Sequence, residues 1–158
     1  MRNIYASWRL EFIKGKNPEG CVFCEAIGSS DDREYGVVKR SSHCVVMLNK
    51  YPYTTGHVMV IPNRHVGDFT QLSVDELHDL ANLTQEYVTV LRKAFEPEAF
   101  NIGMNLGRFA GAGICDHIHT HIVPRWAGDN NFMPVVGGTR IHPMDLETVF
   151  KLIEKFSV

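Results

Sequence analysis

Three histidines alternate with other residues at positions 117, 119 and 121 of this 158-residue chain. Side chains alternate between the two faces of a strand, so His117, His119 and His121 are expected to share one face at intervals of about 6–7 Å. A buried imidazole needs a hydrogen-bond partner of its own. Three on one face therefore indicate chemistry or metal binding rather than ordinary packing.

The length of 158 residues fits a single compact domain that needs no cross-links for its core. Sixteen basic and 18 acidic residues are nearly balanced, and no basic run indicates bulk nucleic-acid binding. The N-terminus lacks the uninterrupted apolar stretch of a signal peptide or membrane span, which favours a cytoplasmic protein without membrane contact. The four cysteines, two of them in a CxxC pair, do not resemble a secreted disulfide framework.

The order of the expected elements predicts an α+β fold with a mainly antiparallel sheet. β-branched residues predict strands over 35–39, 43–48 and 57–61. Residues 29–33 are expected to form a loop, and further strands are expected over 100–106 and 117–123. A C-terminal helix is expected after Pro143, a residue suited to a helix start.

One long helix is predicted from Ser73 to Phe95. Ser73 and Glu76 have the spacing of a capping box, and Leu72 can pack on Leu77. We interpret its apolar stripe as core packing rather than a partner groove. The stripe comprises Leu77, Leu80, Ala81, Thr84, Tyr87, Val88, Leu91 and Ala94.

Three interpretations of the alternating histidines follow from the residues. In the first, all three bind one metal ion, although the outer two lie about 13 Å apart along a strand, which strains a shared site. In the second, a neutral imidazole attacks phosphorus and forms a covalent intermediate. Gly107, Gly111 and Gly113 would let the backbone approach phosphate oxygens, and Arg108 would add positive charge.

The third interpretation is a zinc-stabilised binding module without catalysis. Cys21 and Cys24 have metal-ligand spacing, with His65 and His117 as candidates for the remaining ligands. The other histidines are assigned to structural or surface positions. They are His43, His57, His78 and His142.

The segment His-Ile-His-Thr-His-Ile-Val at 117–123 resembles the signature of the histidine-triad (HIT) family. Cys21-Val22-Phe23-Cys24, residues 48–62 and Asn105-Leu106-Gly107 resemble the family in the same order. The resemblance covers residues 20–135, between an N-terminal arm (1–20) and a C-terminal extension with a helix (136–158). The whole chain is expected to form a single HIT domain.

The resemblance implies a homodimer that binds a purine nucleotide and transfers or hydrolyses a nucleotidyl group at an α-phosphate. His119 would be the nucleophile, and His121 would contact the phosphate or the bridging oxygen. Asn49 resembles the ribose-binding position, and Asn105 would help to hold the phosphate loop.

In the zinc-bearing members of the family, the ligand positions correspond here to Cys21, Cys24, His65 and His117. The resemblance therefore implies a structural zinc ion, and no organic cofactor is expected. This assignment removes the first histidine of the triad from direct chemistry.

Residues 5–9 and 124–133 resemble the bacterial branch of the family that cleaves diadenosine tetraphosphate, as phosphorylase or hydrolase. Many relatives have Gln-Ser or Gln-Thr before the triad, whereas this chain has Gly111 to Asp116. The expected function is cleavage of a dinucleoside polyphosphate, with phosphate or water as acceptor left open. The alternatives are a nucleoside phosphoramidase or adenylyl-conjugate hydrolase, and a non-catalytic nucleotide-binding module.

Overall fold

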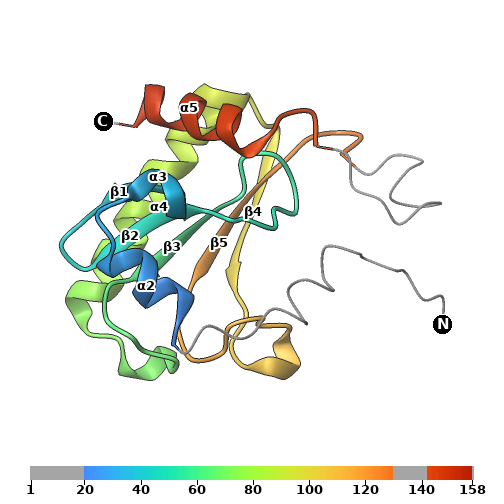
Figure 1. Cartoon of the computed structure of the whole chain (residues 1–158). Helices are drawn as coiled ribbons and strands as arrows, with labels where there is room; N and C mark the ends of the chain where they lie inside the picture. Colours follow the sequence, from blue (N-terminus) through green and yellow to red (C-terminus); the bar gives the residue numbers. More distant parts are fainter. Residues whose placement is uncertain (1–19, 130–141, 158) are drawn as a thin grey trace.

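A five-stranded antiparallel sheet organises the fold (Figure 1). The structure is a computed structural model, which describes residues 20–129 and 142–157. The strands lie in the order β1-β2-β3-β5-β4. Their bounds are β1 Val37–Arg40, β2 Cys44–Leu48, β3 Val58–Pro62, β4 Ala99–Met104 and β5 Thr120–Arg125. The prediction of an α+β fold with a mainly antiparallel sheet is confirmed. Residues 1–19 of the predicted N-terminal arm (1–20) and residues 130–141 lie outside the described residues.

Helices cover both faces of the sheet, which explains why β2 and β3 are buried along their whole length. On one face, Val46, Val60 and Ile122 pack with residues of α4 (Val74–Phe95) and α5 (Leu146–Phe156). On the other, α2 (Val22–Gly28) packs Phe23 and Ala26 against the sheet. The odd-numbered residues of β5, His121 among them, lie on the same face as α2, because His121 pairs with Met59, which packs with Phe23. Helix α2 covers only part of this face.

The long helix α4 begins as predicted, with Ser73 as N-cap and a reciprocal capping box with Glu76. It ends where Glu96 adopts a left-handed conformation with φ 48°. Leu80 is buried as predicted, but Ala81 is exposed, and Leu83 is buried without having been predicted. None of the helices in the described ranges has the length and apolar composition needed to cross a bilayer.

Several element boundaries differ from the predictions, and a specific cap or hydrogen bond explains three of them. The predicted loop over 29–33 runs into a short helix, α3 (Asp32–Tyr35), which Asp31 caps, so β1 starts at Val37. The histidine strand begins only at Thr120, because the Ile118 N–H donates to the carbonyl of Val66 at 2.8 Å instead of pairing with β3. Helix α5 begins at Leu146 with Asp145 as N-cap rather than near Pro143.

Candidate active site and metal centre

Four metal-ligand side chains converge where α2 meets the segment before β5. One donor atom from each of Cys21, Cys24, His65 and His117 lies within 4.8 Å of the others. The Nδ1 atom of His117 is 3.3 Å from Cys21 Sγ and 3.6 Å from Cys24 Sγ. His65 Nδ1 is 3.2 Å from Cys24 Sγ. A tetrahedral zinc site with normal bond lengths separates its ligand atoms by about 3.3–3.8 Å, so these four residues fit zinc.

The other ring nitrogen of His117 fixes which atom faces the thiols. His117 Nε2 lies 2.8 Å from the carbonyl oxygen of Pro62, and because a carbonyl only accepts, Nε2 carries the proton. The lone pair is therefore on Nδ1, which points at the cysteines. Burial lowers the pKa of His117, so the ring is held in the neutral form that a metal requires.

His119 is oriented by the backbone of the same segment. Its Nδ1 donates to the carbonyl of His117 at 3.0 Å, which leaves the lone pair on Nε2. Burial lowers the pKa of His119 below its ordinary value, so the ring is neutral near pH 7. Its ring packs against Phe23 of α2 at a centroid distance of 5.1 Å. A neutral imidazole with a free Nε2 lone pair is competent to act as a nucleophile.

His121 is oriented by His57, a residue that the sequence analysis assigned to a structural or surface position. The surface alternative is wrong: His57 is 1% exposed, and its Nε2 lies 2.9 Å from His121 Nδ1. The Tyr53 backbone N–H donates to His57 Nδ1 at 3.1 Å, so the proton of the neutral ring is on Nε2 and is donated to His121. His121 consequently presents an N–H from its own Nε2.

His121 is neutral over the physiological range. Burial, followed by the neighbouring His119, lowers the pKa of His121 to about 4. The rings of these two histidines are 4.9 Å apart between centroids and nearly perpendicular. A nucleophile with a free lone pair and a neutral N–H donor thus stand side by side.

The residues predicted to bind substrate are dispersed around this pair. Asn105 follows β4 and lines an open trough that starts at His121. Asn49 follows β2, and its side chain accepts from the Tyr51 N–H at 2.9 Å, which closes a turn. Neither that side chain nor the glycine loop lines the trough.

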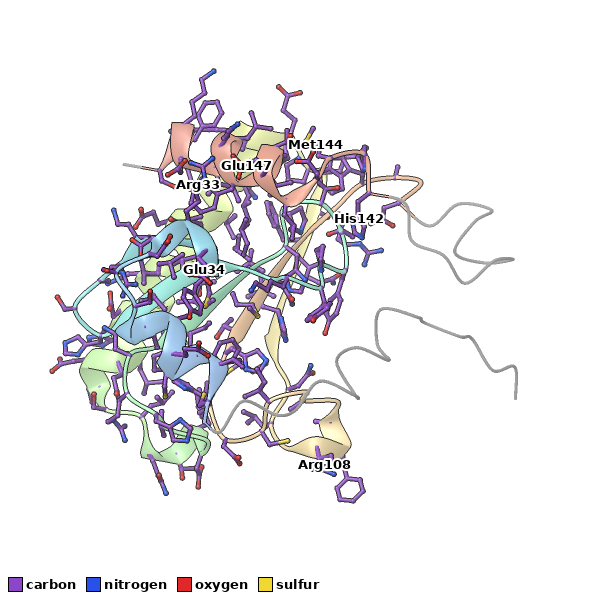
Figure 2. The ribbon with its side chains drawn as sticks, in the orientation of Figure 1. Arg33, Glu34, Arg108, His142, Met144 and Glu147 are labelled. Carbon is purple, nitrogen blue, oxygen red and sulfur yellow. The ribbon has the colours of Figure 1, made fainter. Side chains whose placement is uncertain are left out.

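The glycine-rich loop contains the short helix η2 (Arg108–Ala110). Gly107 and Gly111 have φ of 83° and 94°, a region that disfavours other residues. Arg108 is exposed, and Figure 2 shows it at the bottom of the view, away from His142. The roles of Asn49, Asn105, Arg108 and the three loop glycines, Gly113 included, remain predictions.

Comparison with known proteins decides the family. The model of the HIT domain matches residues 32–128. The chain belongs to the HIT domain family. The resemblance first seen in the triad is therefore confirmed.

Relatives within the HIT family include two proteins named as enzymes. The AP-4-A phosphorylase of Mycobacterium tuberculosis is 39% identical over 122 residues, which are 77% of this chain and 63% of that protein. The asymmetrical bis(5'-nucleosyl)-tetraphosphatase of Schizosaccharomyces pombe is 37% identical over 93 residues, 59% of this chain and 50% of that protein. The chain thus spans less than two thirds of the length of either relative.

Solved HIT structures have the same fold. A Zn-bound histidine triad family protein from Mycobacterium smegmatis superposes with a TM-score of 0.70 at 29% identity, covering 86% of this chain and 91% of that one. A histidine triad nucleotide-binding protein from Sulfolobus tokodaii gives the same TM-score at 28% identity, covering 85% and 90%.

Proposed function

We propose that the protein transfers the nucleotidyl group of a dinucleoside polyphosphate, of the diadenosine tetraphosphate type, through a covalent intermediate on His119. One observation carries the proposal: His119 has its lone pair on Nε2, beside the N–H that His121 presents. The relatives named as a phosphorylase and a tetraphosphatase support the substrate class.

In the first step, His119 Nε2 attacks the α-phosphorus. The N–P bond forms as the bond from phosphorus to the bridging oxygen breaks, and a nucleoside triphosphate leaves when the substrate has four phosphates. His121 donates a hydrogen bond from Nε2 to the bridging oxygen, where negative charge develops. In the second step, water or inorganic phosphate attacks the same phosphorus and the N–P bond breaks. The products are then AMP with water, or ADP with phosphate.

The cluster of Cys21, Cys24, His65 and His117 supports a structural zinc ion. The ion would fasten α2 to the segment that carries His119, and it takes no part in either step. Thiolate ligands must be reduced, which supports a cytoplasmic location. The thiols are free in the structure. Cell fractionation that recovers the protein outside the cytoplasm would contradict the location.

Replacement of the nucleophile tests the covalent step. His119→Asn should abolish labelling of the protein by a radioactive nucleotide and reduce turnover by at least about 10³-fold. AMP affinity should change little, because the binding groups remain. His78→Asn, on the exposed side of α4, is the matched control and should behave as wild type. Full turnover by His119→Asn would exclude the proposed nucleophile.

Product analysis tests the reaction. The protein is incubated with diadenosine tetraphosphate, with and without inorganic phosphate, and the products are separated by chromatography. ADP with ATP formed only in phosphate identifies a phosphorylase, and AMP with ATP formed in its absence identifies a hydrolase. No product from diadenosine tetraphosphate, with turnover of adenosine 5'-phosphoramidate, would replace the proposal by the phosphoramidase alternative.

We also propose that two copies pair along β4. Within the described residues β4 is one of the two edge strands of the sheet, and Ile102 on it is 50% exposed. An apolar, unpaired edge favours strand pairing with another chain. Light scattering after gel filtration should give the mass of a dimer for wild type and of a monomer for Ile102→Lys. Val74→Lys, which changes an exposed apolar residue of α4, should stay dimeric, and a monomeric wild type would contradict the proposal.

A further inference from the structure

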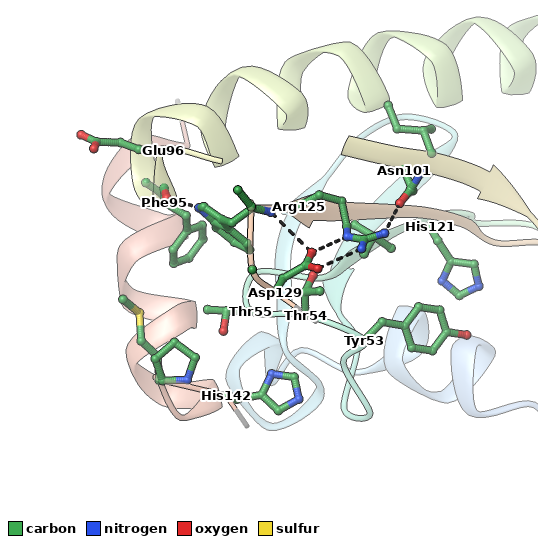
Figure 3. Close-up of a pocket in the computed structure, with 18 of the residues that line it drawn as sticks. Tyr53, Thr54, Thr55, Phe95, Glu96, Asn101, His121, Arg125, Asp129 and His142 are labelled. Atoms are coloured by element: carbon green, nitrogen blue, oxygen red, sulfur yellow. Dashed lines mark hydrogen bonds and ion pairs between the residues drawn. The ribbon is translucent and has the colours of Figure 1, made fainter. Parts of the chain in front are cut away.

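An open trough of about 1080 Å³ extends away from His121 along the histidine face of β4 and β5 (Figure 3). Its floor comprises His121, Val123 and Arg125 of β5 with Asn101 and Gly103 of β4. From His121 to Arg125 the strand rises about 13 Å. This length accommodates a nucleoside, and ligand sites commonly have volumes of about 300–1000 Å³.

Hydrogen bonds hold the walls of the trough in place. The Thr54 hydroxyl donates to the carbonyl of Pro124 at 2.7 Å and fixes one wall to β5. Trp126 Nε1 donates to the carbonyl of Phe95 at 3.3 Å and fixes the other. The trough is therefore a formed site rather than a gap between mobile side chains.

The guanidinium of Arg125 is paired inside the trough. Arg125 makes two hydrogen bonds to Asp129, at 2.5 and 3.0 Å, and a third to Asn101 Oδ1 at 2.6 Å (Figure 3). No lysine is among the described lining residues, which include the aromatic rings of Tyr53 and Trp126. Glu96 adds a carboxylate to the lining. A lining of aromatic rings, amides, a carboxylate and a paired guanidinium suits a flat, uncharged, hydrogen-bonding group better than a chain of phosphates.

The positions of His119 and His121 relative to the trough indicate which part of the substrate lies in it. His121 lines its end, whereas His119 does not line it and packs on Phe23 at the other side. A group leaving the phosphorus bonded to His119 passes the donor on His121 and enters the trough. We propose that the trough binds the nucleoside of the leaving nucleotide, an inference that rests on the proposed function. The transferred nucleotide then lies toward α2.

Gly103 offers a way to fill the trough without a clash inside the chain. It pairs with His121 across the β4–β5 ladder, and an added Cβ would meet no atom within 4 Å. A valine there projects from the floor of the trough, and β-branched residues suit a strand. Ala99 lies on the same face of the same strand, is exposed and does not line the trough. Ala99→Val is therefore the matched control.

The experiment compares diadenosine tetraphosphate turnover with AMP affinity in wild type, Gly103→Val and Ala99→Val. Gly103→Val should lower kcat/KM roughly 10- to 100-fold and leave the dissociation constant of AMP within about twofold, because AMP lacks a leaving nucleotide. Gly103→Ala should fall between wild type and Gly103→Val. Ala99→Val should match wild type in both measurements. Thermal unfolding should confirm that all variants are folded, and light scattering should confirm that they keep the wild-type mass.

The outcomes separate the two proposals. Unchanged turnover in Gly103→Val, or a parallel loss of turnover and AMP affinity, would overturn the trough assignment while an active wild type upholds the proposed function. If the Gly103→Val protein fails to fold, Gly103→Ala is measured instead and judged by the same criteria. Wild-type protein that turns over no dinucleoside polyphosphate would overturn both proposals, since there would be no leaving nucleotide.

Discussion

Backbone groups decide which ring nitrogen of His57 and of His119 carries the proton. The N–H of Tyr53 is only a donor, so His57 must accept at Nδ1 and donate from Nε2 to His121. The carbonyl of His117 is only an acceptor, so His119 must donate to it from Nδ1. The tautomers of the nucleophile and the donor are set independently of any ligand, as preorganised catalysis requires.

Substitution of His57 tests this arrangement. His57→Phe keeps the ring volume but removes both hydrogen bonds, so His121 no longer has a fixed tautomer and kcat should fall by roughly 10² or more, with KM nearly unchanged. His57→Gln should recover part of kcat, because an amide can accept from Tyr53 and donate to His121. Steady-state kinetics on a dinucleoside polyphosphate gives both constants. Equal rates for Phe and Gln variants would show that His57 only fills space.

The sequence predicted the triad residues but not this fourth histidine. Alternation at positions 117, 119 and 121 is visible in the chain itself, and His119 and His121 do lie together. His57 is 64 residues away from His121, and a lone histidine in an apolar strand is usually a structural residue. Its partner could be found only after the strand order placed β3 beside β5.

Among the elements, α4 is held at its start by a network of charge and hydrogen bonds. Glu76 accepts from the Ser73 N–H at 2.7 Å and pairs with Arg64 at 2.8 Å, although Glu76 is only 5% exposed. The hydrogen bond from Arg64 is the main reason that the pKa of Glu76 falls to about 2. The carboxylate therefore joins the segment after β3 to the helix.

Glu76→Gln should reveal this contribution through its pH dependence. The folded pKa of about 2 lies below the ordinary 4.5, so the stabilisation is complete above pH 4.5 and is lost as pH falls toward 2. The gain is up to about 3 kcal/mol. Urea unfolding at pH 7 and pH 3 should show a large gap between wild type and variant at pH 7 and a smaller one at pH 3. A gap independent of pH would contradict the assignment, and Asp75→Asn serves as the control.

The types of the long helix and of the strands were predictable, whereas the short helix α3 and several element starts were not. The capping box at Ser73 is a local signal, so the start of α4 was correct. The start of β5 at Thr120 depends on Val66, which accepts from Ile118 and draws the preceding residues away from β3. Helix α5 starts at its Asp145 cap, and Pro143 alone was an insufficient indicator. Boundaries set by long-range contacts cannot be deduced from a local pattern.

For the whole molecule, the metal cluster joins α2, the segment after β3 and the segment before β5. Cys21 and His117 are 96 residues apart, so a bound ion would close a long loop of chain. The assignment of all 158 residues to one domain remains a prediction, since the family match covers 32–128.

Removal of a ligand should therefore affect stability more than chemistry. Freshly purified protein should contain about one zinc ion per chain, and Cys21→Ser should lose it and lower the melting temperature by roughly 5 °C or more. Cys115→Ser, outside the cluster, is the control and should keep the metal. Metal analysis with calorimetry measures both effects. An unchanged melting temperature after zinc loss would show that the four residues merely pack together.

The strand order also dictates when the site can form during synthesis. Within the described residues β5 is the last strand of the chain, yet it lies between β3 and β4. The strand and the segment before it carry His117, His119 and His121. A nascent chain that has reached β4 already holds Cys21, Cys24 and His65, yet has neither a nucleophile nor a complete metal cluster. Insertion of one late strand then completes both at once. Catalytic competence should thus arise in a single step, when β5 inserts between β3 and β4.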